Sequence, residues 1–540
     1  MEPRSGSSIP PQVLRPSTPP VTSLRAVAEL TGARPAGAAE VPAQVGVTGI
    51  EQRSNAVLPG DLFAGLAGAH AHGARFARAA VEQGAVAILT DPAGAELIGE
   101  IDVPVLVHDA PRSILGELSS ALYGDPSRTL RIVGITGTSG KTTTSYLVEA
   151  GLAAAGLRTA LIGTIETRIG GDRVPSALTT PEAPQLHAMF AVMVERGVQA
   201  VVMEVSSHAL ALGRVDGVEF AVGAFTNLSQ DHLDFHAGFE DYFAAKRRLF
   251  VPDGSAVVPA ARSVVCIDDE WGVRLAGDIA VAAAATGDRE LITVATRPGV
   301  PADWVASAAR PGAAGTQEFA ASGPGANMDV RLRLPGAYNI ANGLLALAVC
   351  TAAGADPATA ARALGEVDVP GRMQRVDRGQ GFLAVVDYAH KPAAIESVVA
   401  TLRALLAEQG GGRLAVVVGA GGDRDAGKRP LMGAAGARGA DLLIITDDNP
   451  RGEDPAVIRA AVRDGAEAVP AAERGQVREV GDRADAITAV VDWASAGDVV
   501  LIAGKGHETG QEISGVKYPF DDREVLAVAL SRKTRDLTHS

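Results

Sequence analysis

The chain has 540 residues, of which 47% are hydrophobic, with a formal net charge of −14 and a pI of about 5.3. Its length exceeds one ordinary hydrophobic core and predicts roughly two to four domains. The acidic balance argues against a protein that binds the nucleic-acid backbone, because no basic stripe is available to displace counterions. No apolar run reaches membrane-spanning length and the start of the chain lacks a signal pattern, so we expect a cytoplasmic protein without a membrane partner.

The basic residues are unevenly divided, with 42 arginines and only seven lysines. In a chain that prefers arginine for surface charge, a lysine marks a position where a primary amine is needed. Five of the seven lysines lie in the motifs described below. The two cysteines, Cys266 and Cys350, are far apart in sequence, which indicates a reducing compartment without a disulfide framework.

Residues 1–23 are rich in proline and serine and are predicted to be disordered. From 24 to 127, short apolar runs alternate with helical patterns, which predicts a small α/β domain. Within it, Ser54 lies in a polar loop between Arg53 and Asn55 and is a candidate to hydrogen-bond a ligand. The plain alternative is a solvated loop serine.

The segment 128–368 begins with LRIVGITGTSGKTTTSY over residues 130–146, which is a buried strand, a glycine turn and the start of a helix. Glycines at 137 and 140 let backbone N–H groups close on an anion, Lys141 reaches outer phosphates, and Thr142 can hold magnesium. The match is to the short form G-T-x-G-K-T. A glycine turn beside a surface lysine is the alternative, but the strand and helix context favours a nucleoside triphosphate site over 134–143.

Two later strands of this segment end in polar residues. The strand at 200–207 ends in Glu204, Ser206, Ser207 and His208, and the strand at 221–229 ends in Thr226 and Asn227 and leads to His232. Ligands bind at the carboxyl edge of open α/β sheets, so we expect these ends to converge. Glu204 and His232 could ligate magnesium, although His232 could also be a structural histidine. Lys246 lies on a helical pattern and, taken alone, is a solvated position.

The segment 369–540 repeats the strand-and-helix alternation, and its strands again end in charge. The GxGGD turn after the strand that begins at 413 matches a dinucleotide fingerprint poorly, so we predict a Rossmann-like domain without a dinucleotide. The charged strand ends are predicted to form a binding rim, and they are Asp387, His390, Lys391, Asp448, Asn449, Arg451, Lys505, His507 and Glu508. Before this segment, Asn339 and Asn342 share a helix face and could cap the helix or meet a nucleotide.

Taken together, ten ordered motifs over about 45–525 resemble the Mur ligases of peptidoglycan precursor synthesis, in particular the branch that adds diaminopimelate. The motifs are TGTSGKTTT (136–144), TTPE (179–182), MEVSSHAL (203–210), TNLSQDHLDFH (226–236), YFAAKRRLF (242–250), LPGAYNIAN (334–342), DYAHKP (387–392), GGDRDAGKRP (421–430), DNPR (448–451) and GKGHE (504–508). The resemblance implies three α/β domains: a UDP-substrate domain (24–127), a central ATPase sheet of the P-loop type (128–368) and a C-terminal Rossmann-like amino-acid domain (369–540).

The resemblance also implies the reaction. ATP would phosphorylate the D-glutamate carboxylate of UDP-N-acetylmuramoyl-L-alanyl-D-glutamate, and the amine of meso-diaminopimelate would attack the acyl phosphate. The catalytic set would be Lys141, Glu204, His232 and Lys246, with two magnesium ions held by Thr142, Glu204, His232 and Lys246 after carbamylation by CO₂. Arg247 and Arg248 would offset the charge of the carbamate. We expect a monomer.

By the same resemblance, the binding residues fall into three groups. Those for ATP are Gly137, Thr138, Ser139, Gly140, Lys141, Thr142, Thr143, Asn339, Asn342, Arg372, Asp387, His390 and Lys391. Those for the UDP-sugar peptide are Ser54, Thr179, Thr180, Ser206 and Arg214. Those for diaminopimelate are Arg424, Asp448, Asn449, Arg451, Gly504 and Glu508. The family's usual Asp-Ser-Arg is Arg53-Ser54-Asn55 here, which departs from the pattern at the UDP end.

Three alternatives stay open at this point. A lysine-adding Mur ligase would be expected to lack DNPR, and a folylpolyglutamate-type ligase would lack the TTPE and MEVSSHAL context. From another class, the chain could be a non-catalytic nucleotide-binding scaffold for wall enzymes. Against the scaffold, every charged position that the chemistry requires is occupied.

Overall fold

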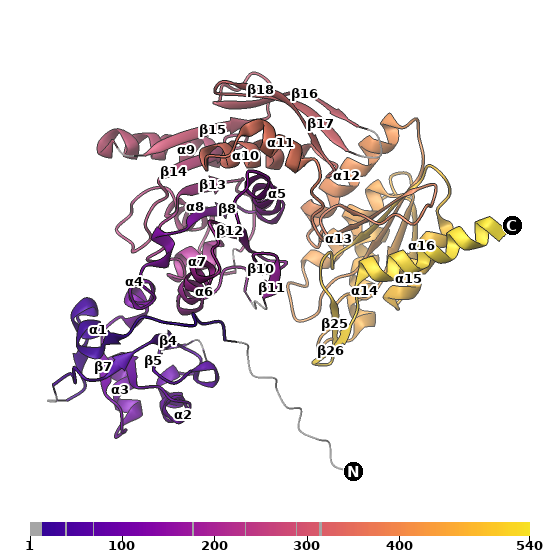
Figure 1. Ribbon diagram of the computed structural model, residues 1–540. Helices are drawn as coiled ribbons and strands as arrows, with labels where there is room; N and C mark the ends of the chain where they lie inside the picture. Colours follow the sequence, from indigo (N-terminus) through magenta and orange to yellow (C-terminus); the bar gives the residue numbers. More distant parts are fainter. Residues whose placement is uncertain are drawn as a thin grey trace, which may run out of the picture. The chain divides into compact units, whose positions relative to one another are not determined.

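The structure is a computed structural model (Figure 1) that describes residues 13–539 except 38, 39, 69, 175–177, 233, 288 and 313–315. Its internal contacts divide the chain into two compact units. Unit 1 comprises the chain up to Val305 with Ala321–Asn327 and Ala341–Ala363, and unit 2 comprises Ala306–Ala320, Met328–Ile340 and the chain from Leu364. The predicted boundary at 127/128 falls within unit 1, so the exact domain limits stay a prediction.

The first part of unit 1 is an α/β layer with the strand order β2-β7-β6-β5-β4. Strands β4 to β7 run parallel and β2 is an antiparallel edge. The strands are β2 (Arg34–Pro35), β4 (Gly49–Glu51), β5 (Asp61–Ala64), β6 (Ala87–Thr90) and β7 (Val105–Val107). The helices are α1 (Leu24–Thr31), α2 (Ala77–Glu82), α3 (Pro92–Ile98) and α4 (Pro111–Leu122), with the 3₁₀ turns η1 (Ser54–Ala56), η2 (Gly73–Phe76) and η3 (Pro126–Arg128). The predicted alternation of strands and helices is confirmed here.

The prediction of disorder over 1–23 is wrong for residues 13–23, while residues 1–12 lie outside the described residues. Arg15 donates to the carbonyl of Ile50 and to the carboxylate of Asp61, both at 3.1 Å. Strand β1 (Thr22–Ser23) pairs with β3 (Gly46–Val47). The composition of this segment misled the prediction, because one arginine with buried carboxylate partners anchors it.

An eleven-stranded sheet, most of which belongs to unit 1, surrounds β8 (Arg131–Thr136), which is buried from its second residue onward. The order is β11-β10-β9-β12-β8-β13-β14-β15-β16-β17-β18. The other strands are β9 (Thr159–Ile162), β10 (Thr167–Ile169), β11 (Asp172–Val174), β12 (Ala200–Glu204), β13 (Val222–Phe225), β14 (Arg262–Cys266), β15 (Glu290–Ala295), β16 (Trp304–Pro311), β17 (Gln317–Gly323) and β18 (Ala326–Leu332). Because β12, β8 and β13 are parallel neighbours, their carboxyl ends meet at one edge.

Helices follow most of these strands, as the sequence pattern predicts. They are α5 (Lys141–Ala154), α6 (Ala183–Glu195), α7 (Ser207–Ala211), α8 (Phe239–Arg247), α9 (Glu270–Thr286), α10 (Ala337–Ala352) and α11 (Pro357–Leu364). Helix α5 begins directly after Gly140, which has a left-handed φ of 87°. The N-terminus of α5 is therefore formed by the glycine turn that the sequence singles out.

Unit 2 contains a six-stranded sheet, coloured orange to yellow in Figure 1, with the order β19-β20-β24-β21-β22-β23. Its strands are β19 (Gln374–Arg375), β20 (Leu383–Asp387), β21 (Leu414–Val418), β22 (Leu442–Ile445), β23 (Gln476–Glu479) and β24 (Val499–Ala503). All but the edge strand β19 run parallel. The chain moves outward from β21 to β23 and then returns to insert β24 beside β20, which is the Rossmann-like arrangement that the sequence predicts.

Helices cover both faces of this sheet. Val416 packs with α12 (Pro392–Glu408), α13 (Lys428–Gly439) and α14 (Pro455–Glu467), whereas the next residue, Val417, packs with α15 (Arg483–Trp493) and α16 (Asp522–His539). Burial on both faces explains why the strands read as uninterrupted apolar runs. A hairpin of β25 (Gly510–Ile513) and β26 (Val516–Pro519) follows β24.

A buried ion pair lies under the carboxyl ends of this sheet. Both side chains of the pair, Arg483 and Asp522, are fully buried, and two N–O distances of 2.7 Å join them. Arg483 also donates to the carbonyl of Ala503 at 2.9 Å and to that of Asp447 at 3.4 Å. One guanidinium therefore holds the ends of β24 and β22 together.

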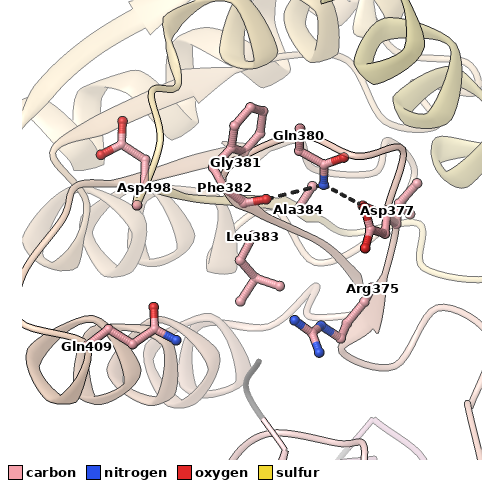
Figure 2. Close-up of a pocket in the computed structure, with 11 residues that line it drawn as sticks. Arg375, Asp377, Gln380, Gly381, Phe382, Leu383, Ala384, Gln409 and Asp498 are labelled. Atoms are coloured by element: carbon pink, nitrogen blue, oxygen red, sulfur yellow. Dashed lines mark hydrogen bonds between the residues drawn. The ribbon is translucent and has the colours of Figure 1, made fainter. Parts of the chain in front are cut away.

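A cavity of about 350 Å³ opens at the opposite, amino-terminal ends of β20 and β24. Figure 2 shows the side chains of Arg375 and Gln409 reaching toward the space beside Leu383, while Gln380 bonds to the carbonyl of Phe382. None of the residues predicted for a site lines this cavity.

Two further sequence expectations concern cysteines and membranes. Cys266 and Cys350 are buried free thiols, which confirms that they form no disulfide with each other. Across the described ranges, no helix combines the length and the apolar character that crossing a bilayer requires.

Asp522→Ala should strongly destabilise unit 2, because it leaves the fully buried Arg483 guanidinium without its counter-charge. We expect the free energy of unfolding, measured by urea denaturation, to fall by about 3–5 kcal/mol. Asp492→Ala is the control, since it removes an exposed pair with Arg532, and should cost less than about 1 kcal/mol. Equal losses in the two variants would contradict a stabilising role for the buried pair.

Candidate functional site

The glycine turn between β8 and α5 has a shape that only glycine can form. Gly137 has φ 143°, and a Cβ there would lie 1.9 Å from the hydroxyl oxygen of Thr226. At Gly140, with φ 87°, a Cβ would lie 2.3 Å from the side-chain oxygen of Asn342. The turn leads into the N-terminus of a 14-residue helix, and this arrangement favours anions.

Two residues that the sequence singled out at the end of β13 hold this turn from outside. Thr226 donates to the carbonyl of Ser139 at 2.7 Å. The Asn227 amide donates to the same carbonyl at 3.1 Å and accepts from the Ser139 N–H, also at 3.1 Å. The converging strand ends predicted from sequence therefore meet at the turn, where Thr226 and Asn227 fix its backbone.

Two lysines converge on one carbonyl of the turn. The ammonium groups of Lys141 and Lys246 donate to the Gly137 oxygen at 2.8 and 2.9 Å. Lys246 is 1% exposed, and its Nζ lies 4.5 Å from the centroid of the Tyr242 ring. Burial, and secondarily the charge of Lys141, lowers the pKa of Lys246 well below its ordinary value, while Asp231 opposes the shift. The amine of Lys246 is therefore biased towards its neutral form.

The expectation that Arg247 and Arg248 offset a charge on Lys246 is wrong. Arg247 pairs with Asp278 at 2.7 Å, and Arg248 pairs with Asp253 at 3.0 Å. Neighbours in sequence on a helix point in different directions, so these side chains face other carboxylates. The cation that acts on Lys246 is Lys141.

Two of the four predicted magnesium ligands are in contact. The Thr142 hydroxyl donates to the Glu204 carboxylate at 3.1 Å, and Glu204 also accepts from the backbone N–H and hydroxyl of Thr164 at 2.9 and 3.0 Å. Glu204 is 1% exposed. Hydroxyl and carboxylate oxygens are the ligands that magnesium prefers. Within the described part of the chain, no three His, Cys, Asp or Glu side chains gather closely enough to hold a metal ion by themselves.

His232 lies in a loop with a left-handed φ of 53°. Its ring makes edge contacts with His208, at 4.9 Å between centroids, and with Tyr242, at 6.1 Å. Tyr242 also contacts Lys246 and bonds to the Thr138 hydroxyl at 3.1 Å. A buried tyrosine thus links His232, Lys246 and the glycine turn.

The residues predicted for the muramoyl peptide lie beside Glu204. Thr179 is 3.1 Å from Thr164 between hydroxyl oxygens, and Thr180 donates to the Glu204 carbonyl at 2.9 Å. Ser206 donates its N–H to Thr180 at 3.2 Å and caps α7. Arg214 donates to the carbonyl of Thr180 at 3.4 Å and forms an ion pair with Glu182 at 2.8 Å. The structure therefore brings these four predicted residues together.

Ser54 lies at the start of η1, between strands β4 and β5 of the small sheet. The preceding Arg53 has its guanidinium on Glu51, with distances of 3.0 and 2.8 Å, and Glu51 is fully buried. Gln185 donates to the same carboxylate at 2.6 Å. Arg53 stands where the family has aspartate, and the Glu51 carboxylate neutralises its charge.

In unit 2, the predicted amino-acid rim forms around the turn after β22. Arg451 has a left-handed φ of 51° and is about a quarter exposed, at 24%. Its guanidinium donates to the Gly422 carbonyl at 2.8 Å and to Glu512 at 3.1 Å. Arg424 is exposed, and a Cβ on Gly421 would lie 3.0 Å from Arg451 and 4.0 Å from Arg424. The two predicted arginines therefore flank Gly421.

The other rim residues are joined by hydrogen bonds. Asn449 donates to Glu508 at 3.0 Å, and Lys505 donates to Asn449 at 2.8 Å. A Cβ on Gly504, which has φ 119°, would lie 2.8 Å from the Asp448 carboxylate. The DNPR and GKGHE motifs thus form one cluster.

The remaining residues predicted to bind ATP lie near strand β20 and on helix α10. The Arg372 guanidinium lies 4.4 Å from the Tyr388 ring centroid, and His390 lies 4.5 Å from it. Asp387 accepts from the backbone at Met373 and Ala389, at 2.7 and 2.8 Å, and burial raises its pKa. Lys391 precedes α12. In α10, Asn339 donates to the Pro335 carbonyl at 2.7 Å, whereas Asn342 adjoins Gly140.

The sequence analysis missed three side chains that organise these clusters, namely Tyr242, Lys505 and Glu512. Tyr242 lies one helical turn before Lys246, a spacing that indicates a shared face. Lys505 was predicted only as one of the residues of the binding rim, without a contact of its own. Glu512 lies on β25 outside every motif, and its contact with Arg451 depends on the hairpin.

Three sequence profiles match the chain. They are described as Mur ligase family, catalytic domain (residues 46–123), Mur ligase middle domain (135–350) and Mur ligase, glutamate ligase domain (371–506). Two similar proteins, both named UDP-N-acetylmuramoyl-L-alanyl-D-glutamate–2,6-diaminopimelate ligase, come from Corynebacterium efficiens and Streptomyces coelicolor. The first is 53% identical and covers 88% of each chain, and the second is 50% identical and covers 97% of this chain and 98% of its own.

A solved structure with the same protein name resembles this one. The TM-score is 0.68 at 31% identity, and the match covers 96% of this chain and 100% of the other. Such coverage includes the small sheet, the central sheet and the Rossmann-like sheet together. The three-domain α/β organisation predicted from sequence is thereby confirmed.

Gly137→Ala should weaken nucleotide binding, because its Cβ would collide with Thr226 and force the turn to open. We expect the dissociation constant for a fluorescent ATP analogue to rise at least about tenfold, the effect of losing one charge-assisted hydrogen bond. Gly277→Ala is the control, since a Cβ there meets nothing within 4 Å. Unchanged binding in Gly137→Ala would overturn the assignment of this turn.

Proposed function

The chain belongs to the Mur ligase family, and on that premise we propose that it joins meso-diaminopimelate to UDP-N-acetylmuramoyl-L-alanyl-D-glutamate at the expense of ATP. The observation that carries the proposal is 50% identity over 97% of the chain to a ligase whose name states this reaction. The reaction would be a cytoplasmic step of peptidoglycan synthesis, on which cell shape and division depend. We expect the enzyme to act as a monomer.

The proposed chemistry explains why a phosphate site is needed. A carboxylate does not react with an amine until it carries a leaving group, so the γ-phosphoryl group of ATP is first transferred to the D-glutamate carboxylate. The amine then attacks the acyl phosphate, and the tetrahedral intermediate expels phosphate. Gly137 to Thr143 would hold the triphosphate, with Lys141 moving from the turn carbonyls to the outer phosphates.

Magnesium fits the donor set at Thr142 and Glu204, where two hard oxygens already lie 3.1 Å apart. We assign one magnesium site to these residues and a second to His232 with carbamylated Lys246. Bound magnesium would neutralise charge on the transferring phosphoryl group. The residues themselves orient the phosphates and hold the carboxylate of the substrate.

Carbamylation of Lys246 is supported by the environment of its amine. The nitrogen must be neutral to attack CO₂, forming an N–C bond and releasing a proton to solvent. Burial, assisted by Lys141, favours that neutral form. The product is an anion, and the Lys141 cation beside it would then attract rather than repel it.

Recognition of diaminopimelate is assigned to the rim of unit 2. Its distal carboxylate would displace Glu512 from Arg451, a forked donor matched to carboxylates, with Arg424 as a second cation. Glu508 would accept from the distal ammonium, beside Asp448, Asn449 and Gly504. Lysine lacks this carboxylate and would leave Arg451 on Glu512, so it should be rejected.

The other binding assignments follow the family pattern. Ser54 would meet the uridine end, and Thr179, Thr180, Ser206 and Arg214 would line the path of the muramoyl peptide from there to Glu204. The remaining ATP contacts would be Asn339, Asn342, Arg372, Asp387, His390 and Lys391.

The proposal is tested by supplying the purified enzyme with ATP, the UDP-dipeptide and either diaminopimelate or lysine. We expect a tripeptide product, seen by mass spectrometry, with diaminopimelate and at least about a hundredfold lower kcat/KM with lysine, since lysine has no distal carboxylate to replace Glu512 on Arg451. Arg451→Ala should remove most of this preference. Turnover of lysine at an equal rate would support the lysine-adding alternative, and no product with either amino acid would support the scaffold.

Lys246→Ala should abolish product formation, and a short-chain carboxylic acid should restore part of it by replacing the carbamate. We expect a loss in kcat of at least about a hundredfold, comparable to removing a catalytic electrostatic group. Wild-type enzyme with the same acid is the control and should gain nothing. Retained activity in Lys246→Ala, without any effect of the acid, would exclude this role.

A further inference from the structure

Lys505 is a buried cation between the two loops assigned to the amino-acid substrate. Its side chain is fully buried, although lysine is almost never fully buried without a partner. The chain turns at Gly504, with φ 119°, immediately after β24. This turn carries Lys505 inward, away from solvent.

Three oxygen-bearing side chains surround its ammonium group. Lys505 donates to the Asn449 side-chain oxygen at 2.8 Å, and it lies 3.7 Å from Asp448 and 3.6 Å from Glu508. Burial lowers the pKa of Lys505, while the carboxylates of Asp448 and Glu508 oppose the shift. The contacts therefore cross-link the loop after β22 to the loop after β24.

Lys505 is one of two donors that determine which way the Asn449 amide faces. The Asn449 oxygen accepts from the Lys505 ammonium and from the backbone N–H of Glu512 at 3.0 Å. Both partners are donors, so the amide nitrogen must point the other way, where it donates to Glu508 at 3.0 Å. A flipped amide would place N–H groups against two donors and leave Glu508 without this bond.

The charges around Lys505 also indicate that it holds the two rim loops in place. Asp448 and Glu508 both carry negative charge beside the amino-acid site, and Lys505 is the cation that touches both. The nearby Arg483 is already bonded twice to Asp522. Without Lys505, no cation would lie between the two carboxylates, and they would repel each other.

We propose that Lys505 is a positioning residue for the amino-acid substrate, which holds the Asn449 amide and the Glu508 carboxylate in the orientation that receives it. This inference rests on the proposed function, because it concerns the amino-acid site of that reaction. Lys505 does not touch the reacting atoms. Its removal should weaken amino-acid binding selectively, with the chemistry of ATP left intact.

Lys533 provides a matched control in the same unit. It also donates to several oxygens, the carbonyls of Val491 and Asp492 at 2.6 and 3.1 Å and that of Ala494. These carbonyls lie at the end of α15 and beyond it, not in either rim loop. Lys533→Met therefore makes the same chemical change at an anchored lysine outside the site.

The test compares steady-state kinetics and melting temperatures of Lys505→Met, Lys533→Met and the wild type. We expect Lys505→Met to raise the KM for diaminopimelate at least about tenfold, the effect of losing a hydrogen bond to a charged group. The KM for ATP should change less than about twofold, since that site uses other residues. Lys533→Met should change only the melting temperature.

A coupling measurement separates positioning from general destabilisation. If Lys505 acts through Asn449, adding Asn449→Ala to Lys505→Met should raise the KM for diaminopimelate by less than about twofold, whereas Asn449→Ala alone should raise it more. Independent, multiplying effects would overturn the proposal. So would equal behaviour of Lys505→Met and Lys533→Met, or equal changes in the KM values for ATP and diaminopimelate.

A second variant and the activity of the wild type help to interpret the result. If Lys505→Met does not fold, Lys505→Gln replaces it, since the amide keeps a donor without the charge and should show a smaller shift in the same direction. If the wild type forms no tripeptide, the proposed function fails. If the wild type is active and the Lys505 variants bind diaminopimelate normally, only this inference fails.

Discussion

The carbonyl oxygen of Gly137 accepts hydrogen bonds from two ammonium groups, those of Lys141 and Lys246. Burial is the main cause of the lowered pKa of Lys246, and the neighbouring charge of Lys141 adds to it. An anion beside the turn would give Lys141 a charged partner. The glycine geometry, the supports from Thr226 and Asn227 and the helix N-terminus of α5 then act in the same direction. The proposed phosphate site therefore relies on the charge of Lys141 and on the backbone of the turn, whereas Lys246 supplies an amine biased towards its neutral form.

The rim of unit 2 follows a related rule, in which charges are paired within the protein. Arg451 is held by Glu512, and Lys505 is held by Asn449, Asp448 and Glu508. In the proposed reaction, the substrate carboxylate would replace Glu512 on Arg451, while Lys505 would keep its partners. A substrate that lacks the carboxylate leaves the Arg451 pair in place. Preference for diaminopimelate over lysine would then come from replacing Glu512 on Arg451, rather than from filling an empty pocket.

Much of the fold could be predicted because the local patterns are strong. Uninterrupted apolar runs such as 414–418 became buried parallel strands, and the polar residues after 204, 225 and 445 lie at their carboxyl ends. Contacts that depend on distant segments could not be predicted. Arg15 meets Asp61, and Glu512 meets Arg451, only after sheets and hairpins have formed. The directions of Arg247 and Arg248 were also missed, since proximity in sequence does not fix the side that a helical residue faces.

The central claim is that ATP activates a carboxylate by forming an acyl phosphate. It is tested most directly with a UDP-dipeptide whose D-glutamate side-chain carboxylate carries ¹⁸O. If the account holds, the inorganic phosphate released during tripeptide formation contains one ¹⁸O atom from that carboxylate, as mass spectrometry would show. If the released phosphate contains no ¹⁸O while tripeptide accumulates, the carboxylate was not activated by phosphorylation and the account is contradicted.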